Sequence, residues 1–403
     1  MPTYQTAADV DVVIATETTA GTAAATGATA YPVRLIGSAG AELKRAIIRS
    51  MEKRDDAFQA MGRLGVKAVD ATYDVEITPG GTNDVLIEAL SRSAWTTANA
   101  IGFATMTTIA IGTNTLTAAG GDFVGSQGLR VGDIFTLSGT TVAGNNGTRN
   151  IITAIGSLTI VTTTGAFTTL AATATGTLTA ARKLVSGTTP TRRSFSIEQY
   201  DESIDYSELF LGMRVVGLDL SFRPGQMAKL KYTLQGMNRT ALATGTSPYF
   251  TAVSAVTTTV ALVADDSTIR FNGAPIVKFT GLDLSFKISS KVEQTIGSTT
   301  PADVFDNDCE ITGSVTSLRE DFSNLTLFDA ETEFEVSLVL RAPTGSPPDF
   351  FSVFLPRVKI QSLNAPVGGD DGAKIETLGL MIGPKVAATG YNGTPFMICT
   401  SGP

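Results

Sequence analysis

The sequence predicts a mainly β protein with two β-barrel or β-sandwich units, each carrying one short helix, and a small all-β domain inserted into the first unit. Three observations support this fold class. Apolar and polar residues alternate clearly between Arg192 and Met237, an order of strand, helix and hairpin occurs twice, and residues 101–181 have a composition of their own. Alternation with a period of two residues is typical of strands with one buried face.

The length of the chain indicates more than one domain. It has 403 residues, whereas a single hydrophobic core stops growing at about 250 to 300 residues. We expect a discontinuous first unit at 1–97 and 187–240, the insert at 98–186, and a second unit with a C-terminal extension at 241–403. A hydrophobic content of 43% with 40 glycines and 16 prolines fits a folded, loop-rich protein.

The charge balance argues against a surface that grips nucleic acid. The formal net charge is -8, whereas nucleic-acid-binding surfaces concentrate Lys and Arg. We expect no secretory signal at the N-terminus and no membrane anchor, since no apolar run approaches the roughly 20 residues of a spanning helix. Cys309 and Cys399 are interpreted as reduced thiols in a cytoplasm, with an incidental disulfide as the alternative.

The hairpin at the end of the alternating segment organises the first unit. Its first strand carries Val216, Leu218, Leu220 and Phe222 on one face, and its second strand carries Leu230, Tyr232 and Leu234. The sequence Arg-Pro-Gly at 223–225 predicts the turn between the two strands.

Upstream of the hairpin, the sequence predicts an extended arm, a strand, a loop, a second strand and a helix. The arm covers residues 6–29, with a flexible terminus as the alternative, and the strands cover 42–49 and 71–77. The charged segment 51–67 between them is predicted to be a docking loop around Phe58, Met61 and Leu64, or equally a solvated loop. A helix at 83–94, capped by Thr82 or Asn83, presents an apolar stripe of Val85, Leu86, Ala89 and Leu90.

The inserted segment is rich in threonine, alanine and glycine, and its charged residues between 101 and 181 are Asp122, Arg130, Asp133 and Arg149. Short strands are predicted at 113–117, 133–137, 150–155, 158–161 and 175–178, separated by Gly and Asn clusters. A disordered low-complexity linker is the alternative. We expect the insert to be a dispensable knob.

An internal repeat is the strongest prediction about architecture. Gly-Leu-Asp-Leu-Ser-Phe occurs at 217–222 and again at 281–286, but the better register places 210–237 over 354–382. In the second copy we expect a strand at 277–288, a loop at 289–308, a strand at 310–316, and a helix at 321–330 with Phe322, Leu325 and Phe328 inward. Phe334, Val336, Leu338 and Leu340 predict a further strand.

The sequence predicts no catalytic, cofactor-binding or metal-binding site, and therefore no enzyme. It contains no histidine, which excludes Ser-His-Asp and Cys-His nucleophile pairs. The glycine-rich segment 368–374 lacks the spacing of a phosphate loop and is interpreted as a hairpin turn. The acidic residues Glu198, Asp201, Glu202, Asp205 and Glu208 lack calcium-loop spacing and are interpreted as a solvated or channel-facing loop. Asp265-Asp266 and Asp370-Asp371 are interpreted as turn residues.

Several motifs together resemble tail tube proteins of long-tailed bacteriophages with non-contractile tails. They are the Phe-Ser-Ile-Glu-Gln start at 195–199, the Gly-Met-Arg-Val strand at 212–215, the Leu-Gln-Gly-Met close at 234–237, and the helix ending before Trp95. The segment from Val12 to the Glu-Thr-Thr-Ala-Gly loop at 17–21 is similar to the first strand and loop of that family. Residues 128–150 resemble a β-rich module of virion proteins.

This resemblance implies a structural virion protein, made in the host cytoplasm, whose rings stack into the hollow tail tube that conducts the genome. It implies tape measure and tail terminator or tip proteins as partners, with DNA passing the lumen without specific binding. The alternatives are a tail terminator or tip component, or an extracellular adhesin or carbohydrate-binding protein. If six barrel units make a ring, two units per chain predict a trimer, with a hexamer still possible.

Two surfaces are expected to matter in such a tube. The segments 51–67 and 289–308, with Phe58 and the arm 6–29, are predicted to bond successive rings. Polar strand faces are predicted to give the lumen a modestly acidic lining that repels DNA. Asp219, Ser221 and Gln361 are candidates for that lining, while Lys229 and Lys231 would complicate it.

Overall fold

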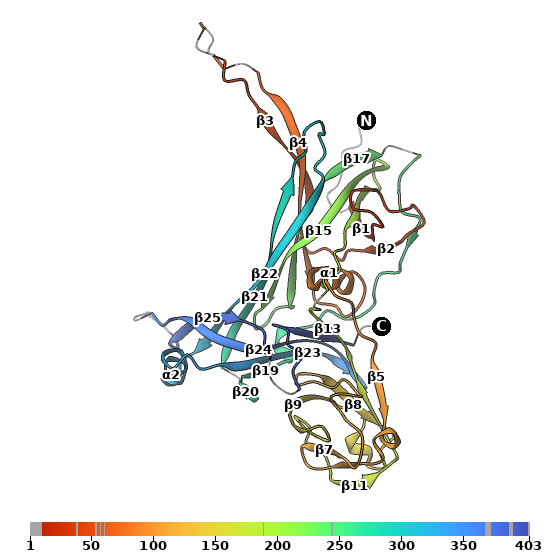
Figure 1. The fold of residues 1–403 in the computed structure, drawn as a ribbon, viewed down its shortest axis with the longest axis vertical. Helices are drawn as coiled ribbons and strands as arrows, with labels where there is room; N and C mark the ends of the chain where they lie inside the picture. The colour runs from red at the N-terminus through yellow and green to blue at the C-terminus, as the bar shows by residue number, and fades with distance from the viewer. Residues whose placement is uncertain are drawn as a thin grey trace.

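The protein is mainly β, as expected. The computed structural model describes residues 10–37, 39–52, 55–56, 58–59, 61–187, 189–242, 245–271, 273–276, 278–366, 372–386 and 390–401. These residues form a sheet of 18 strands and a sheet of eight strands. In the elongated molecule, the insert lies at one end and the hairpin of strands β3 and β4 extends from the other (Figure 1).

The two halves of the chain contribute strands to the larger sheet. The first half supplies β1 (Val10–Thr16), β2 (Thr29–Pro32), β3 (Gly40–Ile48), β4 (Arg63–Glu76), helix α1 (Thr82–Ser91), β13 (Arg182–Val185), β14 (Phe195–Asp201), β15 (Tyr206–Phe222), β16 (Lys229–Gly236), β17 (Asn238–Leu242) and β18 (Ala252–Val253). The second half supplies β19 (Ser267–Phe271), β20 (Ala274–Ile276), β21 (Phe279–Glu293), β22 (Asp303–Leu318), helix α2 (Ser323–Asp329), β23 (Phe334–Gly345), β24 (Pro348–Asn364), β25 (Ile375–Ile382) and β26 (Met397–Thr400).

The insert forms the smaller sheet from β5 (Asn99–Gly102), β6 (Ile109–Ile111), β7 (Thr115–Ala118), β8 (Ile134–Ser138), β9 (Arg149–Ser157), β10 (Ile160–Thr163), β11 (Leu170–Thr173) and β12 (Thr177–Ala180). Sequence patterns located β7, β8, β9, β10 and β12 approximately, and missed β5, β6 and β11. Short 3-10 helices lie at Phe103–Met106, Ala143–Asn145 and Ala264–Asp266.

The central hairpin is confirmed. β15 pairs antiparallel with β16, with Leu218 opposite Tyr232 and Leu220 opposite Leu230. These side chains are buried in the main core, because alternation places every second residue on the same face. At the turn Gly225 has a φ of 70°, a left-handed conformation that favours glycine.

The extended arm predicted at 6–29 contains a strand in its described part. From Val10 onward the arm forms β1, which pairs with β14 and β2; residues 6–9 lie outside the described residues. The helix begins at Thr82 and ends at Ser91, with Leu86, Ile87, Ala89 and Leu90 buried. The predicted caps are wrong, since Gly81 precedes the helix and neither Thr82 nor Asn83 caps it. Their side chains donate instead to the Pro32 and Glu76 carbonyls, at 2.6 and 3.0 Å.

The internal repeat is visible as two sets of four strands that pair in the same order. β3 pairs with β4, β4 with β16, and β16 with β15. In the second half, β21 pairs with β22, β22 with β25, and β25 with β24. The helices α1 and α2 follow β4 and β22 at equivalent places in the chain. The structure thus repeats one strand arrangement, while the domain boundaries remain a prediction.

The repeated hexapeptides are not equivalent positions in the two copies. They pair with each other across the junction between the copies, because β15 runs antiparallel to β21 with Leu220 opposite Leu284. Ser221 Oγ donates to Asp283 Oδ1 at 2.8 Å, and Ser285 Oγ donates to Asp219 Oδ1 at 2.5 Å. The match of 210–237 to 354–382 is one residue out of register along the first strand: Ile197 pairs with Phe210 as Val336 pairs with Leu355, not Phe354.

Parts of the predicted loops and of the second helix are wrong. The predicted loops at 51–67 and 289–308 are too long, because β4 already begins at Arg63, β21 extends to Glu293 and β22 begins at Asp303. Antiparallel pairing along these longer strands satisfies their backbone groups. Phe322 is 67% exposed beside α2, because the guanidinium of Arg319 lies over its ring on the surface, 4.7 Å from the centroid. Phe328 packs on the core as predicted, together with Leu327 rather than Leu325.

A buried carboxylate ties the second hairpin to the first copy. Asp306 of β22 lies 3.0 Å from Arg92 Nε, 2.7 Å from Arg192 Nε and 3.2 Å from Arg214 Nη1. Arg214 Nη2 also lies 2.9 Å from Asp303 Oδ2. The Asp306 side chain is only 8% exposed, so these cations are held by a charge largely removed from water.

The insert has its own apolar core and also packs on the body. Its core includes Phe103, Phe123 and Phe135, and a separate cluster joins Val131 and Ile134 to Phe354 and Met397 of the second half. Gly132, with a φ of 90°, lies so close that an added Cβ would be 2.5 Å from the Phe354 ring. The insert is therefore docked rather than only tethered.

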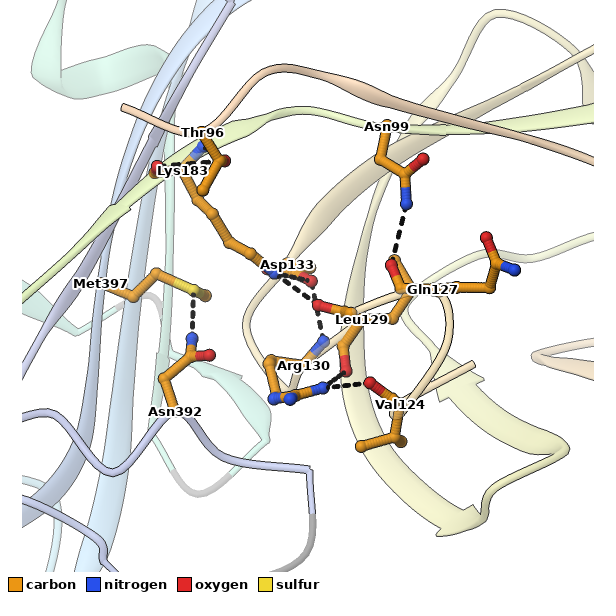
Figure 2. A network of polar contacts seen from close by, with 11 residues as sticks. Thr96, Asn99, Val124, Gln127, Leu129, Arg130, Asp133, Lys183, Asn392 and Met397 are labelled. Carbon is orange, nitrogen blue, oxygen red and sulfur yellow. Dashed lines mark hydrogen bonds and ion pairs between the residues drawn. The ribbon is translucent and has the colours of Figure 1, made fainter. Parts of the chain in front are cut away.

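Polar contacts complete this docking. Figure 2 shows Lys183 reaching Asp133, with Nζ to Oδ2 at 2.7 Å, while the Arg130 backbone N–H donates to the same oxygen. Burial raises the pKa of Asp133, and the Lys183 ammonium opposes that rise. Arg149 Nε donates to the Pro348 carbonyl at 2.7 Å, and burial lowers the pKa of Arg149 to about 10. Asp133 and Arg149 thus attach the insert to the body, whereas Asp122 and the side chain of Arg130 bond within the insert.

Replacing Asp306 by Ala is expected to lower the free energy of unfolding by about 3 kcal/mol, since it leaves the largely buried guanidinium of Arg92 without its anion and that of Arg214 with Asp303 alone. Urea unfolding followed by circular dichroism measures this change. The exposed neighbour Asp308 provides a matched control, because Asp308→Ala should change stability by less than about 0.5 kcal/mol. Equal effects from both substitutions would contradict the anchoring role of Asp306.

Replacing Gly132 by Val is expected to release the insert without unfolding it, because the new side chain meets Phe354 and Met397 and the positive φ disfavours valine. Limited proteolysis should then cut near 96–99 or 181–187 at least about tenfold faster. Gly144→Val is the control, since no atom lies within 4 Å of a Cβ added there. Unchanged cleavage in the Gly132 variant would show that this contact does not hold the insert.

Candidate assembly surface

The repeated strands form one continuous array with an unpaired edge at each end. Its order is β3–β4–β16–β15–β21–β22–β25–β24. Among the described residues, β3 pairs only with β4, and residues 359–364 of β24 pair only with β25. Unpaired N–H and C=O groups on a strand edge are a template for another strand.

The junction in the middle of the array shows how such edges meet. The edge of β15 beyond β14 is covered by β21. The matching edge of β24, beyond its pairing with β23, has no partner in the described part of the chain. Sequence analysis did not find this edge, because an unpaired strand has the same alternation as a paired one.

One face of the array is apolar and buried, and the other is polar. Val75, Tyr232 and Leu218 lie on the buried face, while Asp74, Lys231 and Asp219 lie opposite one another on the polar face. The lysines Lys229 and Lys231 thus share the face of Asp219, which was the complication considered from the sequence. Each lies opposite an acidic residue of β4, Glu76 or Asp74.

The polar face of the second copy has fewer charges in β22 and β25, although Lys287 of β21 lies opposite Glu310 of β22. Where the first copy has Asp74 opposite Lys231, the second copy has Thr316 opposite Thr377. The face therefore alternates between a charged sector and a threonine-rich sector along the array. This difference follows from residue identities and could have been read from the sequence once the register was known.

The two hairpins of the array point toward the same end of the molecule, and β3–β4 extends farther (Figure 1). Its end exposes large apolar side chains: Phe58 is 77% exposed and Met61 is 97% exposed. Apolar side chains in such numbers on an extended hairpin indicate a contact surface. Ile296 is fully exposed at the shorter hairpin.

The acidic residues predicted to form a solvated loop are mostly structural. Glu198 is buried and accepts hydrogen bonds from Ser207 Oγ and from the backbone N–H groups of Tyr249 and Phe250. Asp201 is buried and accepts from Ser203, and Glu208 pairs with Arg239 at 2.8 Å. The prediction is wrong for these residues, because the strand β14 carries Glu198 and Asp201 into the protein. Glu202 is exposed.

Motif residues that supported the resemblance also have structural roles. Glu17 is 7% exposed and accepts from Gly21 N, Ser196 Oγ and Gly212 N, each at 2.9 Å. It thus connects the first loop to β14 and β15. The indole of Trp95 donates to the Asp84 carbonyl at 3.1 Å, and the Arg182 guanidinium lies over its ring.

The other candidate residues form no site. Asp265 and Asp266 lie in the 3-10 helix Ala264–Asp266, and Asp265 accepts from the backbone N–H of Gly225 in the distant β15–β16 turn at 3.0 Å; residues 368–371 lie outside the described residues. Cys309 is an exposed free thiol and Cys399 a buried one, whose pKa burial raises to about 12. Within the described ranges, no cluster of acidic and cysteine side chains could hold a metal ion. The same residues include no helix long and apolar enough to cross a membrane.

Comparison with known proteins identifies a family for this chain. A family model described as phage tail tube protein matches residues 7–381. No curated protein matches the chain. The family match covers nearly all of both copies of the strand array and the insert that lies within the first copy. The chain therefore belongs to the phage tail tube protein family.

Proposed function

We propose that three copies of this chain close into a ring and that these rings stack into the hollow tail tube of a long-tailed phage with a non-contractile tail. The observation that carries the proposal is the doubled strand array with one unpaired edge at each end. Two different edges that fit each other make a heterologous contact, which generates a ring when the rotation closes. If rings in this family contain six units, two units per chain require three chains.

The polar face of the array is the proposed wall of the lumen, through which the genome passes at infection. Long side chains with opposite charge in neighbouring strands, such as Lys231 opposite Asp74 and Asp219, limit phosphate binding because each lysine has a competing carboxylate nearby. The lining proposed from the sequence, modestly acidic, is thereby revised to a mixed lining. Such a wall passes a polyanion without specific binding.

The extended β3–β4 hairpin is the proposed contact between successive rings. The shorter β21–β22 hairpin has fewer exposed apolar side chains at its end, so three contacts per ring are favoured over six. The insert lies at the opposite end from this hairpin (Figure 1) and is proposed to stand on the outside of the tube. Tape measure protein and tail terminator or tip proteins are the proposed partners of the tube.

Two alternatives lead to different assemblies. A tail terminator or tip component would form one ring that does not polymerise. An extracellular adhesin or carbohydrate-binding protein would form no hollow tube. The exposed apolar hairpin favours a polymerising subunit, because a contact surface that is repeated in each ring is covered by the next ring.

Electron microscopy of the purified full chain is expected to show hollow tubes with three chains in each ring. Image reconstruction should place the polar face around the channel, with Lys231 and Asp219 lining it. A ring of six chains would refute the trimer, and single rings without tubes would favour the terminator. A channel lined by the apolar face or by the insert would refute the proposed lumen.

Replacing Phe58 by Asp is expected to block tube growth while leaving folded, soluble protein, because a charge is placed in the ring contact. Sedimentation should show at least about a tenfold loss of polymer at equal protein concentration. Leu158→Asp is the matched control, since Leu158 is also exposed but lies in the insert. Tubes of normal length from the Phe58 variant would mean that the hairpin end is only solvated.

A further inference from the structure

We propose that the unpaired edge of β24 in one copy joins the unpaired edge of β3 in the next, antiparallel and in the register of the internal β15–β21 junction. Ser362 to Ala365 would then lie opposite Lys44 to Ala41. This inference rests on the proposed function, since it assumes that copies of the chain meet side by side. It adds the pairing of individual residues, which the ring by itself does not define.

Strand irregularities align the two copies residue by residue. The β3–β4 ladder is interrupted between Arg45 and Ile47, and the β21–β22 ladder between Ile288 and Ser290. The β15–β16 ladder is interrupted between Val215 and Gly217, and the β24–β25 ladder between Ile360 and Ser362. A bulge adds a residue to one strand and fixes the register around it. Ile47 is therefore equivalent to Ser290, and Ser362 to Gly217.

The residue pairs of the β15–β21 junction then predict the pairs between the two free edges. Leu218 lies opposite Phe286 in the junction, which places Leu363 opposite Leu43 between copies. Leu220 lies opposite Leu284, which places Ala365 opposite Ala41. Each predicted pair is apolar like its template, and both members are half-buried in the single chain.

The polar pair of the β15–β21 junction also has an equivalent pair at the proposed interface between copies. Ser285 Oγ donates to Asp219 Oδ1 at 2.5 Å, and the equivalent residues are Glu42 and Asn364. Both are exposed in the single chain. An Asn amide can donate to a Glu carboxylate, so the direction of the hydrogen bond is reversed while the contact is kept.

A second contact supports the same register independently. In the single chain, Ser290 Oγ donates to Gln235 Oε1 at 2.7 Å across the junction. The equivalents of Ser290 and Gln235 are Ile47 and Met381. Both polar residues of the internal contact are therefore replaced by apolar residues at the proposed interface. Ile47 is 58% exposed and Met381 is 52% exposed. Contact between neighbouring copies would remove both from water.

A cysteine pair tests the register. Glu42→Cys with Asn364→Cys, in a Cys309→Ser background, should form disulfides between copies when assembled protein is oxidised. Opposite residues of antiparallel strands have Cα atoms about 4.5 to 5.5 Å apart, within disulfide range. Denaturing gels without reductant should show covalent oligomers, with closed trimers as the largest product. Asp219→Cys with Ser285→Cys is the positive control and should form a bond within one chain.

A shifted pair provides the negative control. Lys44→Cys with Asn364→Cys joins diagonal positions about 7 to 8 Å apart, beyond disulfide range, and should give at least about tenfold less product. Tubes without product from the matched pair, or equal product from the shifted pair, would overturn the register. Failure of the unmodified chain to assemble at all would instead refute the proposed function.

A second test, which needs no disulfide, introduces the Ser290 and Gln235 contact at the equivalent positions of the proposed interface. Ile47→Ser or Met381→Gln alone should raise the protein concentration needed for assembly about tenfold, a loss of about 1.4 kcal/mol, because a polar group then faces an apolar one. The double variant recreates the Ser290 and Gln235 pair and should assemble at a concentration near that of the unmodified chain. Additive losses in the double variant would show that these two residues do not meet.

Discussion

The antiparallel pairing of β15 with β21 is the interaction on which the rest of the structure depends. It turns two copies of a four-stranded arrangement into one array with a continuous apolar face and a continuous polar face. Without this pairing, each copy would expose another strand edge to water. The pairing also fixes where the free edges of the array lie, because β3 and β24 are the strands that remain after every internal edge is matched.

Side-chain ion pairs and hydrogen bonds add to the backbone hydrogen bonds of the β15–β21 junction. Asp306 holds Arg92, Arg192 and Arg214, and the carboxylates of Asp219 and Asp283 accept hydroxyl hydrogen bonds from the facing strand. At the free edges, Lys359 replaces Arg214, and Leu64 replaces Asp306. A permanent junction can contain buried charge because its partners fold together. A contact made between separate copies would have to desolvate such charges on association, which is costly, so apolar residues suit it better.

The insert shows how a domain can be added without disturbing the array. Its first and last strands, β5 and β12, pair directly with each other, with Asn99 opposite Ala180, so the chain leaves and re-enters the body at neighbouring points. Insertions between close ends are well tolerated. The packing of Gly132 on Phe354 and Met397, together with the pairing of Lys183 and Asp133, then holds the insert in one orientation. The insert is thus packed against the body, while its dispensability for assembly stays a prediction.

The sequence alone determined the strand content, the central hairpin, the separate insert and the repeat, because alternation, turn residues and composition are local patterns. For the same reason, the apolar stripe predicted for α1 included three of its buried apolar residues, Leu86, Ala89 and Leu90. Tertiary structure alone decided that the two hexapeptides face each other, that Glu198 and Asp201 are buried, and that β4, β21 and β22 extend into the segments predicted as loops. Such features depend on which strands become neighbours. A strand edge, a cap and a buried carboxylate have the same local sequence whether or not a partner from a distant part of the chain reaches them.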